Sequence, residues 1–371
     1  MSGPLKETAE GQKMEDAEPG ISKIGKLAFW RDLLLVVSIT IAGLYYAQGF
    51  LIPLALALLL FILLTALIDR IAQIAIGGKS MPVWLAHILG ILVIVIGFAG
   101  VFSILSIQAS EVAAAIPRYT DRFTKILATI VATIGDENAV AIKNMMANLN
   151  VSSYAAKTLG SAGAAFSSFM LIALYIPFLM LERSPMRKKM QLAVHDSSVG
   201  ERLDTVLISI TSGIQHYIEI KTAVSVLTGV LTYAIMRAVG LDFAETWAIM
   251  IFMLNFIPTI GSIFAVVVIS IVALVQFETY TPFLIVAIGG GLVQFVVGSV
   301  LEPPLMGKSL NLSPMMVLIA LTFWGSLWGL SGAFLSVPIT VCVLIFLSNI
   351  TNTRWIAVLM SGDGKLSADI K

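Results

Sequence analysis

Residues 33–68 read LLLVVSITIAGLYYAQGFLIPLALALLLFILLTALI, and this stretch decides the fold. Its 36 residues carry no charged side chain. A helix that crosses the hydrocarbon core of a membrane needs about 20 apolar residues, so the stretch has room for two crossings. Residues that can mark a turn between helices lie near its middle: Tyr45, Gln48, Gly49 and Pro53. The pattern predicts two membrane helices, over about 33–48 and 52–68.

The rest of the chain repeats this pattern. Of its 371 residues, 58% are hydrophobic and 12% are charged, whereas ordinary soluble domains carry about 25% charged residues. The mean hydropathy is +0.95. Further charge-free stretches occur at 80–110, 158–181, 246–277, 279–301 and 309–353. A membrane β-barrel would instead show alternating segments of about ten residues. The sequence therefore predicts an all-α integral membrane protein.

Two of the charge-free stretches differ from simple spans. Six full crossings are expected, at 33–48, 52–68, 83–106, 160–181, 221–239 and 282–301. The windows 246–277 and 309–353 remain, and each is broken near its middle by proline or glycine, in NFIPTIGS at 255–262 and GSLWGLSG at 325–332. A re-entrant or broken helical hairpin fits the first window, provided that its tip is buried in protein or lines a cavity. The second window fits either a hairpin or two full spans.

The positive charges predict how the chain is oriented. With the N-terminus in the cytoplasm, 17 Lys and Arg residues lie inside and 6 lie outside, as the positive-inside rule requires. The hairpin after span 221–239 is then entered from outside and the one after span 282–301 from inside. Two helix-plus-hairpin units of opposite orientation form an inverted arrangement, which is typical of secondary transporters.

This topology divides the chain into seven expected segments. They are a cytoplasmic N-terminal tail (1–30), spans one to three (31–106), an extracytoplasmic amphipathic helical segment (107–157), span four (158–181), a cytoplasmic linker (182–220), a transport unit with the two repeats (221–353) and a cytoplasmic C-terminal tail (354–371). The first 30 residues lack the apolar core of a signal peptide.

Composition and motifs argue against several other functions. A net charge of +1 provides no basic field for nucleic acid. The single cysteine, Cys342, allows neither an intrachain disulfide nor a cysteine metal cluster. Residues 307–309 read GKS, like the end of a phosphate-binding loop, but the motif requires a glycine at the position of Glu302 and a preceding strand. We expect no enzyme activity, no cofactor and no metal site.

Several long segments carry a family resemblance. IKTAVSVLTG (220–229), NFIPTIGSIFA (255–265), GSVLEPPLMGKSLNLSP (298–314) and LTFWGSLWGLSGAFLSVPITV (321–341) resemble signature segments of the autoinducer-2 exporter family of bacterial membrane proteins. The resemblance implies a multi-pass inner-membrane transporter that forms homo-oligomers, with ring-like pentamers as the expected form. Members export the quorum-sensing signal autoinducer-2, and others are linked to sodium–proton exchange, so the resemblance leaves the substrate open.

Glu302 is the first candidate for a transport role. A carboxylate at a membrane helix end can take and release a proton, which makes Glu302 the candidate ion-coupling residue. Gly290, Gln294 and Gly298 precede it at four-residue spacings, so one helix face is expected to be small and polar and to form a substrate path or a sliding surface. The alternative is a structural glutamate, bonded to backbone N–H groups or paired with Lys308.

The hairpin tips supply the remaining candidates. Proline and glycine free backbone groups that a solute or an ion can use. In the first tip the candidates for the substrate path are Asn255, Pro258, Thr259, Gly261 and Ser262, and in the second they are Ser326, Gly329 and Ser331. The alternative is a structural kink whose polar side chains bond the freed carbonyls. Trp324 and Trp328 could stack on a sugar-like ring or simply pack.

The leading hypothesis is a secondary transporter that exports a small polar metabolite, such as an autoinducer-2-like signal, by ion-gradient-driven alternating access. The expected partners are the solute, a proton or sodium ion, the lipid bilayer and further copies of the chain. A sodium–proton antiporter is the first alternative, and a non-transporting scaffold or channel is the second.

Overall fold

The computed structural model describes residues 18–73, 75–76, 79–134, 162–193, 197–306, 311–350 and 352–366. Lys308 and residues 135–161 lie outside these ranges. The chain divides into two compact units, Met1–Ile52 and Pro53–Lys371, and each is described by itself. In the first unit, helix α2 (Glu18–Tyr46) is followed by a turn at Ala47 and by the start of α3 (Gln48–Ala72). The long apolar stretch therefore forms two helices, as its turn residues predict, although Pro53 lies inside α3.

The second unit is helical apart from one short hairpin among the described residues. After α3 come the antiparallel strands β1 (Ala75–Ile76) and β2 (Lys79–Ser80). The helices that follow are α4 (Val83–Ile134), α7 (Ala162–Ala193), α8 (Ser197–Val239), α9 (Ala244–Leu254), α10 (Ile260–Gln276), α11 (Tyr280–Gln294), the π-helix η1 (Phe295–Leu301), α12 (Glu302–Met306), α13 (Pro314–Ser348) and α14 (Arg354–Met360).

Helix length and composition confirm a multi-pass membrane protein. Within the described residues, five helical segments are long and apolar enough to cross a membrane: Gln48–Ala72, Trp84–Gln108, Asp204–Ala238, Tyr280–Met306 and Pro314–Ser348. Shorter apolar segments lie at Leu34–Tyr46 and Phe169–Glu182, where the sequence predicts the first and fourth of six crossings. These two segments have fewer than the roughly 20 residues of a typical span.

Two helices continue through boundaries that the sequence suggests. Helix α4 runs 52 residues without interruption, so the expected outer segment begins as an extension of the third span. Helix α8 runs 43 residues and joins part of the expected 182–220 linker to the fifth span. Polar side chains such as Gln108 and Glu219 make the surface of these helices more polar. Glutamine and glutamate have high helix propensity, so the helices continue through them.

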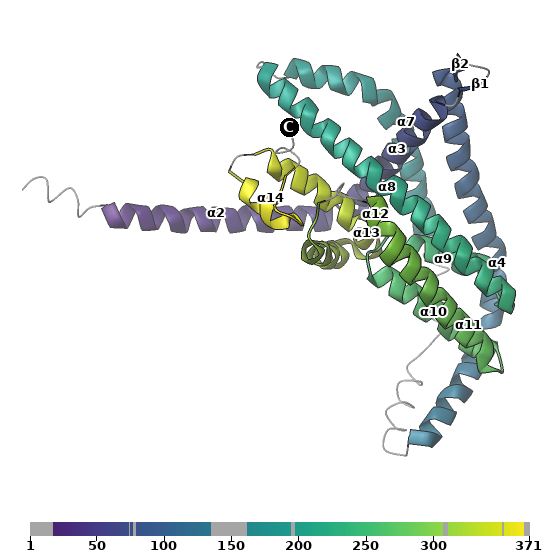
Figure 1. The fold of residues 1–371 in the computed structure, drawn as a ribbon. Coiled ribbons are helices and arrows are strands. Elements are labelled where there is room, and N and C mark those ends of the chain that lie inside the picture. The colour runs from purple at the N-terminus through teal and green to yellow at the C-terminus, as the bar shows by residue number, and fades with distance from the viewer. Residues whose placement is uncertain are drawn as a thin grey trace, which may run out of the picture. The chain divides into compact units, whose positions relative to one another are not determined.

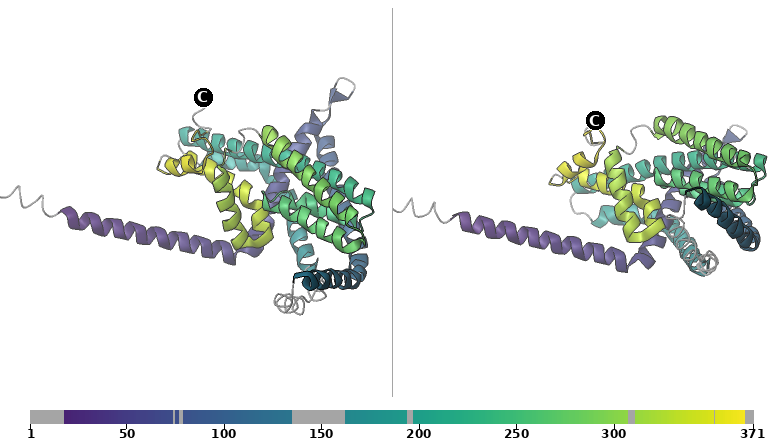
Figure 2. Two further views of the ribbon diagram at one scale, coloured as in Figure 1. Left: turned by 60° about the horizontal axis from the view of Figure 1, so that its bottom comes forward. Right: turned by 90° about the horizontal axis from the view of Figure 1, so that it is seen from below.

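The core that positions the site lies among α8, α9, α10 and α11, which pack on one another. These helices run close together in Figure 1 and in the two further views of Figure 2. Its fully buried side chains are Met236, Leu241, Ala244, Ile251, Ala265, Ile269, Ala273 and Val286. Small alanines allow close helix contact. A second cluster joins α3, α4 and α7 around Leu64, Ile68 and Ala86.

The chain folds back sharply in both broken windows. Between α9 and α10, Thr259 has φ 58° and ψ −58° and the Ile260 N–H donates to the Pro258 carbonyl at 2.5 Å, which is a strained γ-turn. In α13 the bend is at Gly329, with φ 60° and ψ −138°, a conformation that suits glycine. Within the second window, α13 (Pro314–Ser348) therefore forms two helical limbs joined at a bend.

Each bend has a glycine in its second limb that touches the first limb. A Cβ on Gly261 would overlap the carbonyl oxygen of Leu254 and lie 2.8 Å from its carbonyl carbon. A Cβ on Gly332 would overlap the carbonyl oxygen of Trp324 and lie 2.6 Å from its carbonyl carbon. Residues seven or eight apart in a straight helix are about 10–12 Å apart, so both contacts show that the chain reverses.

Candidate functional site

A pocket of about 620 Å³ lies among α8, the first bend, α10 and the segment from α11 to α12. Helix α8 contributes Tyr217 and Lys221. The remaining lining residues are Pro258, Thr259, Ser262, Ile263, Val266, Val267, Gly291, Gln294, Phe295, Gly298, Ser299, Glu302, Met306, Val317 and Val337. The wall is mostly apolar with a few polar groups, as small-molecule sites usually are.

The structure brings six of the expected substrate-path residues into this pocket: Pro258, Thr259, Ser262, Gln294, Gly298 and Glu302. The expected common face of Gln294, Gly298 and Glu302 thus lines one wall. Gly290, on the same spacing, is instead buried against Ile269. Ser326, Gly329 and Ser331 lie outside the pocket, and the Ser326 hydroxyl donates to the Phe323 carbonyl in its own helix.

Asn255 and Gly261 lie behind the pocket wall. Asn255 is 2% exposed. Its amide donates to the Ser225 hydroxyl of α8 at 3.0 Å, and the Ser262 hydroxyl donates to its amide oxygen at 3.2 Å. Asn255 therefore ties the first bend to α8 and orients one pocket hydroxyl. Part of the polar character of the tip is structural, in line with the alternative interpretation.

Glu302 forms an ion pair inside the pocket. The Lys221 Nζ lies 2.5 Å from the Glu302 Oε1, and the two side chains are 6% and 19% exposed. Lys221 comes from the middle of α8, 81 residues earlier in the chain. Among the described residues the partner of Glu302 is Lys221. Lys308, the alternative partner that the sequence suggests, lies outside the described residues. A lysine inside a membrane helix is costly unless it is paired, and this cost was the available signal for Lys221.

The wall between Gln294 and Glu302 is a π-helix, Phe295–Leu301. π-Helical turns are rare and occur frequently at functional sites. Gln294, Gly298 and Glu302 line the pocket along this π-helical segment and at its two ends. Nothing in the sequence predicts this local change of helix type.

Both amide atoms of Gln294 are buried, and none of the described residues offers either atom a hydrogen bond. Most buried side-chain polar atoms in proteins are paired. Gln294 therefore stands apart from Asn255, which is also an amide in this region but is bonded on both sides.

The two bends are in contact. The ring of Phe256, in the first bend, stacks on Phe334, in the second limb of α13, with centroids 4.8 Å apart. Trp324 and Trp328 pack on each other at 5.1 Å, and Trp328 is buried. These contacts match a packing role for the two tryptophans.

Sequence comparisons agree with this architecture. The sequence model described as AI-2E family transporter matches residues 34–352. The chain is 29% identical to the AI-2 transport protein TqsA of Escherichia coli K12, over 93% of this chain and 98% of that one. It is 30% identical to a putative transport protein of Haemophilus influenzae, over 88% and 94%. A putative transport protein of Borreliella burgdorferi is 37% identical over 54% and 56%.

The chain belongs to the AI-2E transporter family. It is a membrane transporter, and the pocket that contains Glu302 and Gln294 is its candidate functional site.

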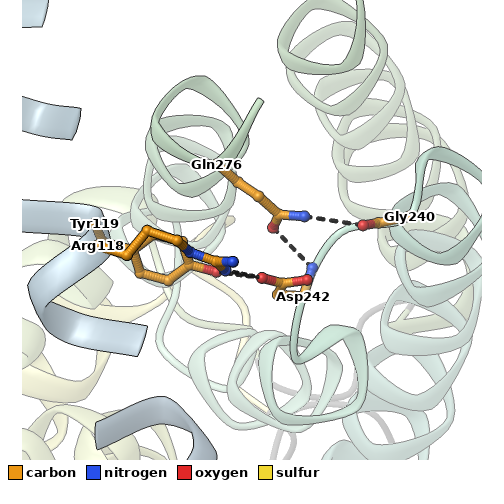
Figure 3. A network of polar contacts seen from close by, with 5 residues as sticks. All are labelled: Arg118, Tyr119, Gly240, Asp242 and Gln276. Atoms are coloured by element: carbon orange, nitrogen blue, oxygen red, sulfur yellow. Dashed lines mark hydrogen bonds and ion pairs between the residues drawn. The ribbon is translucent and has the colours of Figure 1, made fainter. Parts of the chain in front are cut away.

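This AI-2E transporter has a second polar cluster near the far end of α8, centred on Asp242 in the loop between α8 and α9 (Figure 3). Its carboxylate accepts hydrogen bonds from Arg118 and Tyr119 of α4, the latter at 3.0 Å. The Gln276 amide accepts from the Asp242 backbone N–H at 2.8 Å and donates to the Gly240 carbonyl at 2.9 Å. The cluster holds the extension of α4, the loop and the end of α10 together.

Tyr119 makes this attachment dependent on pH at the alkaline end. Burial, followed by its bond to Asp242, raises the pKa of Tyr119 to about 12, above its usual value of about 10. The neutral phenol therefore contributes its full stabilisation below about pH 10, and this is lost as the pH rises through about 12.

We expect Tyr119→Phe to lower the free energy of unfolding by about 1 kcal/mol at neutral pH, since one hydrogen bond is lost. The melting temperature of the purified transporter should then fall less steeply between about pH 9 and about pH 12 than that of the unmodified protein. Equal slopes for the two proteins would show that Tyr119 does not control the alkaline loss.

Proposed function

We propose that this transporter exports a small polar metabolite, of the kind represented by autoinducer-2, across the bacterial inner membrane, with transport driven by an ion gradient. The buried Lys221–Glu302 pair in the pocket wall is the observation that carries the proposal. A titratable pair inside a membrane pocket provides a place where ion binding and solute binding can affect each other. The name of the Escherichia coli relative supports the substrate class.

Glu302 is the proposed ion-coupling residue. A proton that binds its carboxylate removes the negative charge, so Lys221 loses its partner and the contact between α8 and α12 weakens. When the proton leaves, the pair closes again. Because α12 follows the π-helical wall of the pocket, opening and closing of this pair changes the wall that the solute meets.

Alternating access would come from two units of opposite orientation. The first unit is the end of α8 with the bent α9–α10 pair, and the second is α11 to α12 with the bent α13. The similar glycine contacts at Gly261 and Gly332 and the contact of the two bends through Phe256 and Phe334 support this assignment. Inverted repeats with broken helices that meet near the midplane are how many secondary transporters work.

Transport by purified protein in liposomes tests the proposal. Autoinducer-2 should move against its concentration difference when a proton or sodium gradient is imposed, and the movement should saturate and stop when the gradient is collapsed. Sodium-dependent proton movement without any solute would favour an antiporter instead. Solute flux that never saturates and needs no gradient would favour a channel, and absence of all flux would favour a scaffold.

Thiol labelling tests the proposed orientation, with both termini cytoplasmic. In a Cys342→Ala background, cysteines at Arg237 and Glu278, which flank the first bent pair, should both react with an impermeant reagent added from outside. A cysteine at Lys189 should not react, because residues 182–193 follow the fourth apolar segment and carry a cytoplasmic excess of positive charge. If Glu278→Cys reacts only from inside, the α9–α10 pair crosses the membrane once, and the inverted arrangement is wrong.

The assembly is proposed to be a homo-oligomer, with a pentamer as the form that the family resemblance suggests. Native mass spectrometry of the protein in lipid nanodiscs measures this directly.

A further inference from the structure

Gln294 is a buried amide with no hydrogen-bond partner among the described residues, and it belongs to the pocket wall. Leaving a buried donor and acceptor unpaired is unfavourable. An apolar residue of similar length would avoid this cost, so stability does not explain a glutamine here. Unpaired buried groups in a folded protein call for an explanation, and a binding role is one.

The charges around the pocket limit what such an amide can bind. Among the described lining residues, Lys221 and Glu302 are the charged ones, and each neutralises the other at 2.5 Å. The other polar side chains of the wall are hydroxyls and the amide itself, at Tyr217, Thr259, Ser262, Ser299 and Gln294. With the pair closed, the pocket has no spare charge for an anion or a cation.

The Gln294 amide is also held in place by no hydrogen bond to the described residues. A glutamine whose amide is bonded to its surroundings must break those bonds before it can turn toward a ligand. Gln294 has none to break within the described part of the chain. The neighbouring segment is the π-helix, a local geometry that is frequent at functional sites.

We propose that Gln294 is the specificity-determining residue of the pocket. It selects uncharged solutes that present a hydrogen-bond donor and a hydrogen-bond acceptor side by side, as the nitrogen and oxygen of a carboxamide do. Such a group satisfies the amide N–H and the amide oxygen together, whereas a carboxylate offers only acceptors and an ammonium only donors. The inference rests on the proposed function, because it assigns this pocket to the transported solute.

Three fragments of nearly equal size separate these chemistries: propionamide, propionate and propylammonium. Their binding is measured by ligand-observed NMR on the full-length protein in lipid nanodiscs, without any ion gradient. Propionamide should bind the unmodified protein more tightly than the two charged fragments. In Gln294→Met, which keeps the length of the side chain and removes its polar atoms, propionamide binding should fall at least tenfold.

Gln276 provides the matched control. Its amide is bonded on both sides, to Gly240 and Asp242, and it lies outside the pocket. Gln276→Met should therefore lower the melting temperature and leave propionamide binding unchanged. Gln294→Met should instead weaken propionamide binding, and its melting temperature should equal or exceed that of the unmodified protein.

The proposal is overturned if Gln294→Met retains propionamide binding, if the unmodified protein binds propionate or propylammonium as well as it binds propionamide, or if none of the three fragments binds. A lower melting temperature in Gln294→Met would also overturn it, because the amide would then have a structural partner. Fragment binding needs no transport, so selective binding without gradient-driven export contradicts the proposed function alone.

Discussion

Glu302→Gln on its own is expected to remove most of the assembled protein from the membrane, and adding Lys221→Met is expected to restore it. The single change leaves the Lys221 ammonium, which is 6% exposed, without a counter-charge. Breaking a buried ion pair by removing one member costs about 3–5 kcal/mol, whereas replacing both members with uncharged groups of similar size is often neutral. That loss is a large share of a typical stability of about 5–15 kcal/mol.

The double variant then separates the structural role of the pair from its coupling role. If Glu302 carries the coupled proton, Lys221→Met/Glu302→Gln should assemble normally but show no gradient-driven export. Assembly is measured as the yield of monodisperse protein, and export is measured in liposomes. Normal assembly with normal proton-driven export would remove Glu302 from the coupling mechanism.

The single variants also provide an internal check, because each leaves a different member of the pair behind. Lys221→Met leaves the Glu302 carboxylate without a counter-charge, and Glu302→Gln leaves the Lys221 ammonium without one, so both single variants should be recovered in low yield. Normal yields of both single variants would indicate that the pair is not buried in the membrane-embedded protein.

The second large effect is expected at the bends. Gly261→Ala and Gly332→Ala each place a methyl group on a backbone carbonyl of the preceding limb, at Leu254 and Trp324 respectively. Backbone atoms cannot move aside as the end of a flexible side chain can. Each bend must open, and the contact between Phe256 and Phe334 is then lost. A cost above about 4 kcal/mol is exceptional for a single substitution, and we expect it here.

Gly325→Ala is the matched control for these variants. Gly325 lies in α13, as Gly332 does. The nearest atom to a Cβ added at Gly325 is the Ala333 Cβ at 3.9 Å, which is an ordinary contact. Its yield and melting temperature should stay close to those of the unmodified protein or rise, since alanine favours helix by up to about 1 kcal/mol over glycine. Full yields of Gly261→Ala and Gly332→Ala would mean that the two limbs of each bend lie further apart than the contacts of Gly261 and Gly332 indicate.

Some features of the site were predictable because they depend on local pattern. Charge-free stretches predict membrane helices, and the prolines and glycines of 255–262 and 325–332 predict bends. The spacing of Gln294, Gly298 and Glu302 predicts that they share a surface, and all three line the pocket. Other features depend on residues far apart in sequence. Nothing near Glu302 indicates that Lys221 is its partner, and the expectation that Ser326 and Ser331 join the same site was reasonable for a polar bend but does not match the pocket.

The sequence by itself determined that this protein is a helical, multi-pass membrane protein of the AI-2E family, because hydrocarbon accepts only long apolar segments whose backbone bonds are satisfied internally. Only the tertiary structure decided which polar groups meet. The packing of α8 against α12 pairs Lys221 with Glu302. The turn at Asn255 uses its amide to bond Ser225 and Ser262, and Gln294 is left without a bond. A hydrogen bond or ion pair needs two groups within about 3–4 Å, and only the packing of helices sets that distance between residues many positions apart in the chain.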